Sequence, residues 1–259
     1  MRDSRRSVGW WALGMIALVA FTVAFYPSVK GNASFDELFE DLPETVRVLV
    51  GAQEGVPLTS PPGYLHARLF SIMVPVLLLT FGIGVGARAI GGSEADGTLE
   101  LLLANPATRR RVAVERYLAM GLLLVAVTAA LSVSLLAFAP LAGLLDGIRI
   151  TRLLAAGLAA LGLALLHATL AFAVGCATGR PGPAVAVATS VGTAAYLLQG
   201  LAATSDALGS LTAVSPWHWY LDRNILVDGL APVAVVAPLV VSILVFAAGA
   251  WLFDRRDLR

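Results

Sequence analysis

The stretch Gly91–Arg116, GGSEADGTLELLLANPATRRRVAVER, is the polar segment around which the rest of the chain is arranged. Its first half carries acidic residues and glycines, and its second half carries a cluster of arginines. Long apolar runs lie on both sides of it, Leu69–Ile90 before and Tyr117–Leu145 after. Because each run is long enough to cross a bilayer as a helix, we interpret 91–116 as the loop between two membrane spans, and our hypothesis is that it is a coupling segment.

The composition is typical of a membrane protein with several spans. Apolar residues make up 58% and charged residues 14% of the chain, and the mean hydropathy is +0.82. A soluble domain has about 45–50% apolar and about 25% charged residues. Backbone polar groups in hydrocarbon must be paired, so each apolar run should be helical. We therefore predict an all-α polytopic membrane protein, a single transmembrane domain over residues 1–259, with spans at about 8–26, 69–90, 117–145, 153–178, 183–203 and 232–253.

The distribution of basic residues predicts the orientation of these spans. Inner loops of membrane proteins carry an excess of Lys and Arg. With the N-terminus inside, twelve of the eighteen basic residues fall in inner segments and six in outer ones. We therefore expect both termini and 91–116 to be cytoplasmic, and 27–66 and 205–229 to be external. The inner basic residues are Arg2, Arg5, Arg6, Arg88, Arg109, Arg110, Arg111, Arg116, Arg180, Arg255, Arg256 and Arg259.

Two polar side chains stand out within the predicted spans. His167 lies midway along the fourth span and Gln199 lies in the fifth. A charged imidazolium there would cost about 2.5–3.5 kcal/mol on insertion scales, and no Asp or Glu lies inside a span to offset it. We expect a neutral ring bonded to a neighbouring helix, through a side chain such as Gln199 or Ser132. A proton-coupling role is the alternative.

The second span and the two outer segments carry further local signals. Pro75 predicts a kink in the second span, and Gly82 and Gly86 favour close helix packing. The stretch 34–50 has an apolar helical stripe, which fits either an amphipathic lid on the membrane surface or a solvated connector. Trp217, Trp219 and Tyr220, in the second outer segment, are typical of the membrane–water boundary.

Within the coupling segment the order of residues predicts a short helix followed by the start of a membrane helix. Ser93–Asp96 should start the first, with acids at its positive end, and Asn105–Pro106 should break it. Thr108 is placed to cap the helix that enters the membrane next. A simple arginine-anchored loop is the alternative, but it explains only the arginines and not the ordered acids, glycine and leucines.

This segment resembles the E-x-x-G-T-L-E-x-L-L-x-x-P-x-x-R signature of ABC transporter permeases of the type 2 exporter class. In that family the loop is a coupling helix that docks in a groove of the cytoplasmic ATPase subunit. Ser215–Tyr220 and Gly229 similarly resemble the family's S-P-x-x-W/Y…G segment before the last helix. The residues that match the coupling signature are Glu94, Gly97, Thr98, Leu99, Glu100, Leu102, Pro106 and Arg109.

The resemblance implies the membrane-spanning permease subunit of an ATP-driven exporter in the plasma membrane. The chain contains no G-x-x-x-x-G-K-[ST] motif, and its one lysine is Lys30. We therefore expect no enzyme activity, metal or cofactor in this chain, and ATP with Mg²⁺ on a separate ABC ATPase subunit. A second permease chain, identical or different, is expected to complete the pathway. No nucleic-acid partner is expected.

Other functions remain open at this point. An ABC-family subunit that transmits a signal or a maturation step would have the same coupling segment. An ion-coupled secondary transporter would normally show paired charges at the midplane and internal repeats, which we do not find here. An intramembrane hydrolase using Ser190 lacks the G-x-S-x-G context. The weakly polar spans favour an amphiphile or a hydrophobic molecule as substrate.

Overall fold

The computed structural model describes residues 2–32, 36–37, 43–53, 55–98, 108–202 and 205–256. All regular elements in this part of the chain are helical, and six helices in it are long and apolar enough to span a membrane. The predicted all-α fold with six membrane helices is therefore confirmed. The long helices are α1 (Arg2–Phe25), α5 (Met73–Ala87), α8 (Arg109–Phe138), α9 (Ile150–Thr178), α10 (Pro181–Leu201) and α14 (Val233–Arg255).

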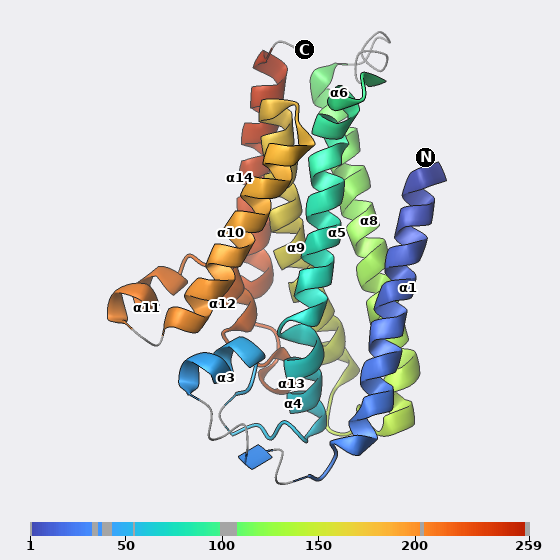
Figure 1. Cartoon of the computed structure of the whole chain (residues 1–259), viewed down its shortest axis with the longest axis vertical. Helices are drawn as coiled ribbons and strands as arrows, with labels where there is room; N and C mark the ends of the chain where they lie inside the picture. Colours follow the sequence, from blue (N-terminus) through green and yellow to red (C-terminus); the bar gives the residue numbers. More distant parts are fainter. Residues whose placement is uncertain are drawn as a thin grey trace.

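The six long helices run side by side, and short helices gather at one end of the bundle (Figure 1). The opposite end holds the short helix α6 (Ser93–Ala95), and both chain ends lie toward it (Figure 1). This places the start of the coupling segment at the end to which both termini point. The short helices of the other end are α3 (Glu44–Val50), α4 (Pro61–Leu65), α11 (Asp206–Thr212), α12 (Pro216–Leu221) and α13 (Ile225–Asp228).

Helix α9 forms the centre of the bundle and packs against α5, α8, α10 and α14. Small residues allow these close approaches, as is common between membrane helices. A methyl group on Gly86 of α5 would come within 2.3 Å of the Ala168 carbonyl oxygen, and one on Gly82 within 3.1 Å of the Ala168 Cβ. On the opposite side, a methyl group on Gly249 of α14 would lie 2.7 Å from the Ala173 Cα. The packing role predicted for Gly82 and Gly86 is confirmed.

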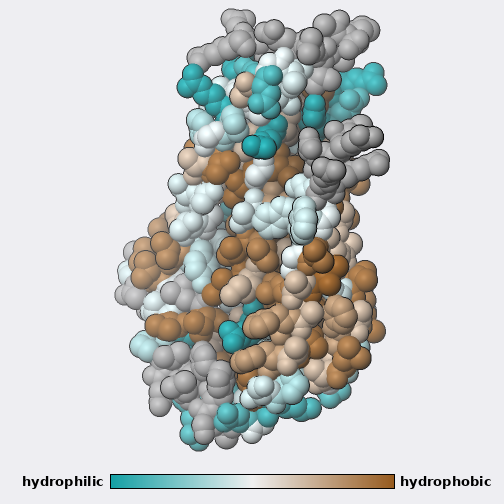
Figure 2. All heavy atoms as spheres, turned by 45° about the vertical axis from the view of Figure 1, so that its right-hand side comes forward, coloured by the Kyte–Doolittle hydropathy of each residue, from teal (hydrophilic) through white to brown (hydrophobic). Residues whose placement is uncertain are grey.

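Large apolar side chains cover the outside of the bundle. In the view of Figure 2 they spread over the middle and lower part of the molecule, while hydrophilic residues lie toward both ends. A soluble protein rarely exposes apolar patches of this extent, whereas lipid chains would cover them. Exposed examples on α1, α8 and α14 are Trp10, Leu13, Phe21, Leu118, Leu122, Val133, Ile243 and Leu244.

The second membrane segment is interrupted near its outer-segment end. Helix α4 continues into a π-helical turn, η2 (His66–Phe70), and regular α-helix resumes at Met73. Pro75 therefore lies in the first turn of α5, where its missing N–H costs no hydrogen bond. The kink predicted at Pro75 is not a mid-helix bend, since the irregular turn precedes the proline.

Two aromatic residues of α12 hydrogen-bond to neighbouring segments, one to this interrupted segment and one to α10. Tyr220 donates a 2.6 Å hydrogen bond to the Phe70 carbonyl oxygen, and the Trp217 indole donates a 2.9 Å bond to the Gly192 carbonyl oxygen. Both side chains are buried, and burial raises the pKa of Tyr220. Both rings are therefore packed inside the protein and join helices to one another, while their level relative to the membrane–water boundary stays a prediction. Trp219 is half-buried and donates to the Ala213 carbonyl oxygen.

The first outer segment is described in part. Most of the apolar stripe predicted within 34–50 lies outside the described residues, so the choice between a lid and a connector stays open. Helix α3 begins at Glu44, directly after Pro43. The Asp36 carboxylate accepts hydrogen bonds from the Thr59 amide and hydroxyl, at 3.1 and 2.6 Å, and so ties two parts of the segment together.

Candidate functional site

The coupling segment begins as the end of a membrane helix. Helix α5 passes through a π-helical turn, η3 (Arg88–Gly92), into α6. Gly97 then adopts a left-handed backbone with φ +67°, which favours glycine and ends the helix. The prediction that 93–96 starts a new helix is therefore wrong: its acids lie at a C-terminal end. Since that end of the helix dipole repels anions, another group must stabilise Glu94.

Arg256, which follows α14, supplies that group. Its guanidinium donates to both carboxylate oxygens of Glu94, and the Nη1–Oε1 distance is 3.0 Å. The Glu94 side chain is 6% exposed and the Arg256 side chain 18%. Such a two-bond arginine–carboxylate pair is strong and directional. It joins the first acidic residue of the coupling signature to the end of the last membrane helix, 162 residues later.

Gly179, the residue that ends α9, makes room for this pair. A methyl group there would lie 2.5 Å from both Arg256 Nη1 and Glu94 Oε1. Its φ of +67° is also a conformation that other residues rarely adopt. The ends of α6, α9 and α14 therefore meet at one buried ion pair.

The far end of the coupling segment reaches the same place. Helix α8 starts at Arg109, and the Thr108 hydroxyl accepts a 3.3 Å bond from the Arg111 amide, which confirms the predicted cap. Arg109 Nη1 donates to the carbonyl oxygens of Phe253, at 3.2 Å, and of Arg256. Its guanidinium also lies 5.9 Å from the centre of the Phe253 ring. Arg109 therefore binds the carbonyl end of α14, where a cation is favourable.

We call Glu94, Arg109, Gly179, Phe253 and Arg256 the loop-base cluster. It brings together Glu94 and Arg109, the first and last residues of the coupling signature. These two residues are linked through the end of α14, to which each of them bonds. The sequence indicated Glu94 and Arg109, but it placed Arg256 only among the inner basic residues and did not single out Gly179. The signal that could have found Arg256 was an acid at the C-terminal end of a membrane helix, where the helix dipole disfavours a negative charge.

The middle of the signature is less fully described. The Thr98 hydroxyl donates a 3.0 Å bond to the Ser93 carbonyl oxygen across the turn at Gly97. The remaining predicted coupling residues, Leu99, Glu100, Leu102 and Pro106, lie outside the described residues.

His167 is buried at the contact of α9 and α10. Its Nδ1 lies 2.9 Å from the Leu163 carbonyl oxygen of its own helix, and its Nε2 has no partner among the described groups. A methyl group on Gly192 of α10 would lie 3.1 Å from the imidazole Cδ2. The predicted bond to a neighbouring helix is therefore wrong: Nδ1 bonds to the ring's own helix, and the neighbouring residue of α10, Gly192, has no side chain to offer Nε2. Ser132 instead donates to the Thr128 carbonyl oxygen.

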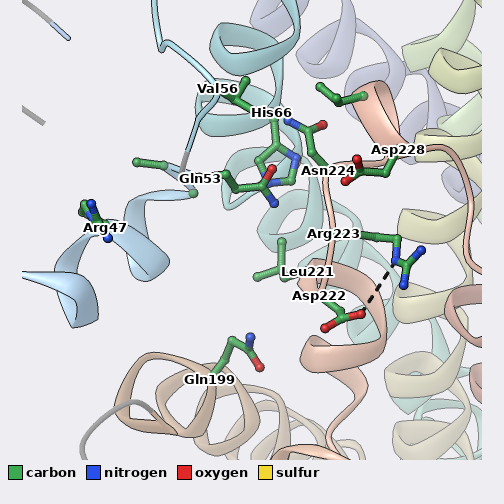
Figure 3. A pocket seen from close by; sticks show the side chains of 13 residues that line it. Arg47, Gln53, Val56, His66, Gln199, Leu221, Asp222, Arg223, Asn224 and Asp228 are labelled. Carbon is green, nitrogen blue, oxygen red and sulfur yellow. Dashed lines mark ion pairs between the residues drawn. The ribbon is translucent and has the colours of Figure 1, made fainter. Parts of the chain in front are cut away.

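Gln199 is far from His167, near the end of α10 that meets the short helices. It lies seven residues beyond Gly192, roughly 10 Å along a helix axis. There it lines a polar cavity of about 430 Å³, which we call the outer pocket (Figure 3). His167 and Gln199 thus do not form one polar site.

An apolar cavity of about 490 Å³ lies between α5 and α10; we call it the α5–α10 chamber. Its walls are aliphatic except for a few hydroxyl groups, the Tyr196 ring and the Trp217 ring. Such a chamber, within the membrane-spanning part of both helices, suits an apolar molecule or the tail of an amphiphile. In the described residues no group of three or more His, Cys, Asp or Glu is arranged to hold a metal ion.

Comparison with known proteins identifies the family. Residues 1–258 match the family described as ABC-2 family transporter protein. Neither the curated proteins nor the solved structures gave a match. Membrane subunits of this family generally work with an ATPase subunit and are not themselves ATPases. The six membrane helices, and a match that covers nearly the whole chain, lead to one conclusion: the chain belongs to the ABC-2 transporter family, as a membrane-spanning permease subunit.

Proposed function

We propose that this chain is the permease subunit of an ATP-driven exporter, and that residues 91–116 receive the movement of a separate cytoplasmic ATPase subunit. The observation that carries the proposal is the loop-base cluster. Glu94 and Arg109, near the two ends of the segment, both bind the end of α14. A force on the segment would therefore act directly on the last membrane helix.

The packing of the bundle gives that force a path. Helix α14 packs along α9, α9 packs along α5 and α10, and α5 leads into the coupling segment itself. Movement of the segment would thus reach both walls of the α5–α10 chamber. Rigid helices moving relative to one another are a common way for such proteins to change access to a site.

A second permease copy, identical or different, is part of the proposal. Helix α10 exposes large apolar side chains on the side that does not face α9, and the α5–α10 chamber opens beside them. A partner chain on this face would close the chamber into a pathway. The exposed residues of α10 are Val185, Val187, Val191, Leu197 and Leu201.

The orientation that we propose places the coupling segment and both termini in the cytoplasm of a plasma-membrane protein. Two observations support this orientation. Arginine is in excess in the loops that we assign to the cytoplasmic side, and α6 lies at the end of the bundle to which both termini point (Figure 1). ATP and Mg²⁺ would bind to the partner ATPase.

Co-purification with a cytoplasmic ABC ATPase subunit from the same cells tests this function. Leu99→Asp and Gly97→Pro should abolish stimulation of ATP hydrolysis, while the permease still inserts into the membrane. Gly97→Pro is incompatible with the observed φ of +67°. Glu115→Gln, which removes an exposed partner of Arg111 in the same region, is the matched control and should keep stimulation. Normal binding and stimulation in both test variants would refute the proposed coupling; coupling without substrate flux would favour signal transmission over export.

A further inference from the structure

The outer pocket is walled by elements from four distant parts of the chain. These are α3 with the turn that follows it, the start of η2, the end of α10, and the segment between α12 and the end of α13. In Figure 3 the His66 ring lies between Gln53 and Asn224, and Gln199 lies on the opposite side of Leu221. With about 430 Å³, the pocket has room for a small polar molecule or a lipid headgroup.

The pocket contains polar groups that the protein does not satisfy. Asn224 is 1% exposed; its Oδ1 accepts a 3.1 Å bond from the Leu226 amide, but its Nδ2 has no partner among the described groups. The Gln199 Oε1 is likewise buried and unpaired in the described part of the chain. Leaving such groups unpaired costs about 1–3 kcal/mol each, so buried amides normally have a partner. Asn224 and Gln199 therefore both line the cavity, and each keeps one buried amide atom without a partner in the described part of the chain.

Charged side chains of both signs line the pocket beside these amides. Some of these side chains form ion pairs within the protein and others do not. Asp222 lies 3.8 Å from Arg223 and 3.7 Å from His218, so these charges have partners within the protein. Arg47 and Asp228 also line the pocket, and neither forms an ion pair with another described residue; Arg47 is half-buried, whereas Asp228 is exposed and acts electrostatically on the His66 ring. In Figure 3 they lie on opposite sides of the His66 ring.

This arrangement selects one class of ligand. A simple anion would be repelled by Asp228, and a simple cation would be repelled by Arg47. A neutral sugar would form an ion pair with neither residue. A zwitterion can form a charge-assisted hydrogen bond with Asp228 through its cationic group and with Arg47 through its anionic group, and such bonds are stronger than neutral ones. We propose that the outer pocket binds a zwitterionic group, with its ammonium at Asp228 and its carboxylate or phosphate at Arg47, in a pocket that the amides of Asn224 and Gln199 also line.

The pocket lies next to the α5–α10 chamber. Tyr196 and Gln199 are three residues apart on α10, and Trp217 and Leu221 are four apart, so each pair shares a helix face. The first member of each pair lines the chamber and the second lines the outer pocket. The zwitterionic group can therefore belong to a free small molecule or to a lipid whose chain enters the chamber. Binding itself does not require the ATPase, so it is independent of the proposed coupling.

Binding measurements on the full-length permease in phosphatidylglycerol nanodiscs test the proposal without ATP or ATPase. The probes are alanyl-alanine for a free zwitterion and lysophosphatidylethanolamine for a lipid-borne one. N-acetyl-alanyl-alanine and lysophosphatidylglycerol, which lack the ammonium, are the matched probes. We expect at least one zwitterion to bind, and its ammonium-free counterpart to bind at least about tenfold more weakly. Which zwitterion binds distinguishes the two sources.

Variants locate the binding in the pocket. Arg47→Gln and Asp228→Asn each remove an unpaired charge and should weaken binding by about tenfold or more. Arg223→Gln removes the same charge as Arg47→Gln from another wall of the pocket, but from a group already paired with Asp222, and should change binding by less than about threefold. Gln199→Leu provides a fourth variant that does not touch the charges; it should weaken binding as well.

Three results would overturn the proposal. The first is that no zwitterion binds, the second is equal binding of the ammonium-free probes, and the third is a loss in Arg223→Gln equal to that in Arg47→Gln. Thermal unfolding of each variant, compared with the unaltered protein, shows that a loss of binding is not a loss of fold. Failure of ATPase stimulation in the coupling test would leave these binding results unchanged.

Discussion

Arg256→Gln is the change that most directly tests whether the coupling segment is fixed to α14. It removes both guanidinium bonds to the Glu94 carboxylate, which is 6% exposed. Removing one partner of a buried ion pair costs about 3–5 kcal/mol, and the partial exposure of Arg256 places the expected loss near about 3 kcal/mol. The change should also weaken transmission from the segment to α14, so ATPase stimulation should fall with stability.

Arg110→Gln is the matched control. Arg110 forms a 3.1 Å ion pair with Asp254 at the same end of α14, but its side chain is 74% exposed and that of Asp254 is 37% exposed. Exposed pairs contribute about 0.2–1 kcal/mol. Arg256→Gln and Arg110→Gln each remove one positive charge at the same end of α14. A difference in stability between the two variants therefore reports the burial of the ion pair and not the net charge.

Gly179→Ala tests the cluster without changing any charge. The added methyl group would lie 2.5 Å from both members of the Glu94–Arg256 pair, on a backbone with φ +67°. We expect it to resemble Arg256→Gln. The assays are the thermal unfolding midpoint of the purified permease and its stimulation of the partner ATPase. If Arg256→Gln and Arg110→Gln give the same midpoint and the same stimulation, the loop-base cluster is not the link that we infer.

Three further predictions concern orientation, the buried histidine and the α12 aromatic residues. In a background lacking Cys176, a cysteine at Ser93 should be labelled by an impermeant reagent only after the membrane is opened. His167→Gln should keep transport because the ring bonds to a backbone carbonyl of its own helix and packs beside Gly192, whereas His167→Leu should lower the unfolding midpoint slightly. Tyr220→Phe, which removes the bond to the Phe70 carbonyl oxygen, should cost about 1–3 kcal/mol of stability in thermal or denaturant unfolding.

The contrary outcomes are equally specific. Labelling of the Ser93 cysteine in intact cells would reverse the proposed orientation. Loss of transport in well-folded His167→Gln, with ATP hydrolysis retained, would favour a proton-coupling role over packing. For Tyr220→Phe the control is Trp219→Phe, since Trp219 is half-buried and bonds only within its own outer segment. An equal loss in both would show that the buried bond to Phe70 contributes little.

The sequence alone predicted the helices, because a span depends on local properties. Length and apolarity were enough for six membrane helices, since hydrocarbon leaves the backbone no other partner than its own helix. Local chemistry also predicted the Thr108 cap and the close packing at Gly82 and Gly86. The coupling signature identified Glu94 and Arg109 as candidates in the same way, from spacing within one short segment.

Contacts between distant residues were decided by the tertiary structure. Glu94 meets Arg256 because α6 and α14 end side by side against Gly179, and no spacing in the sequence shows which helix ends meet. His167 lies against Gly192, and Tyr220 is buried beside the interrupted turn before Pro75, for the same reason. Apolar length determines that a helix spans the membrane, whereas the fit of small residues between helices determines its neighbours.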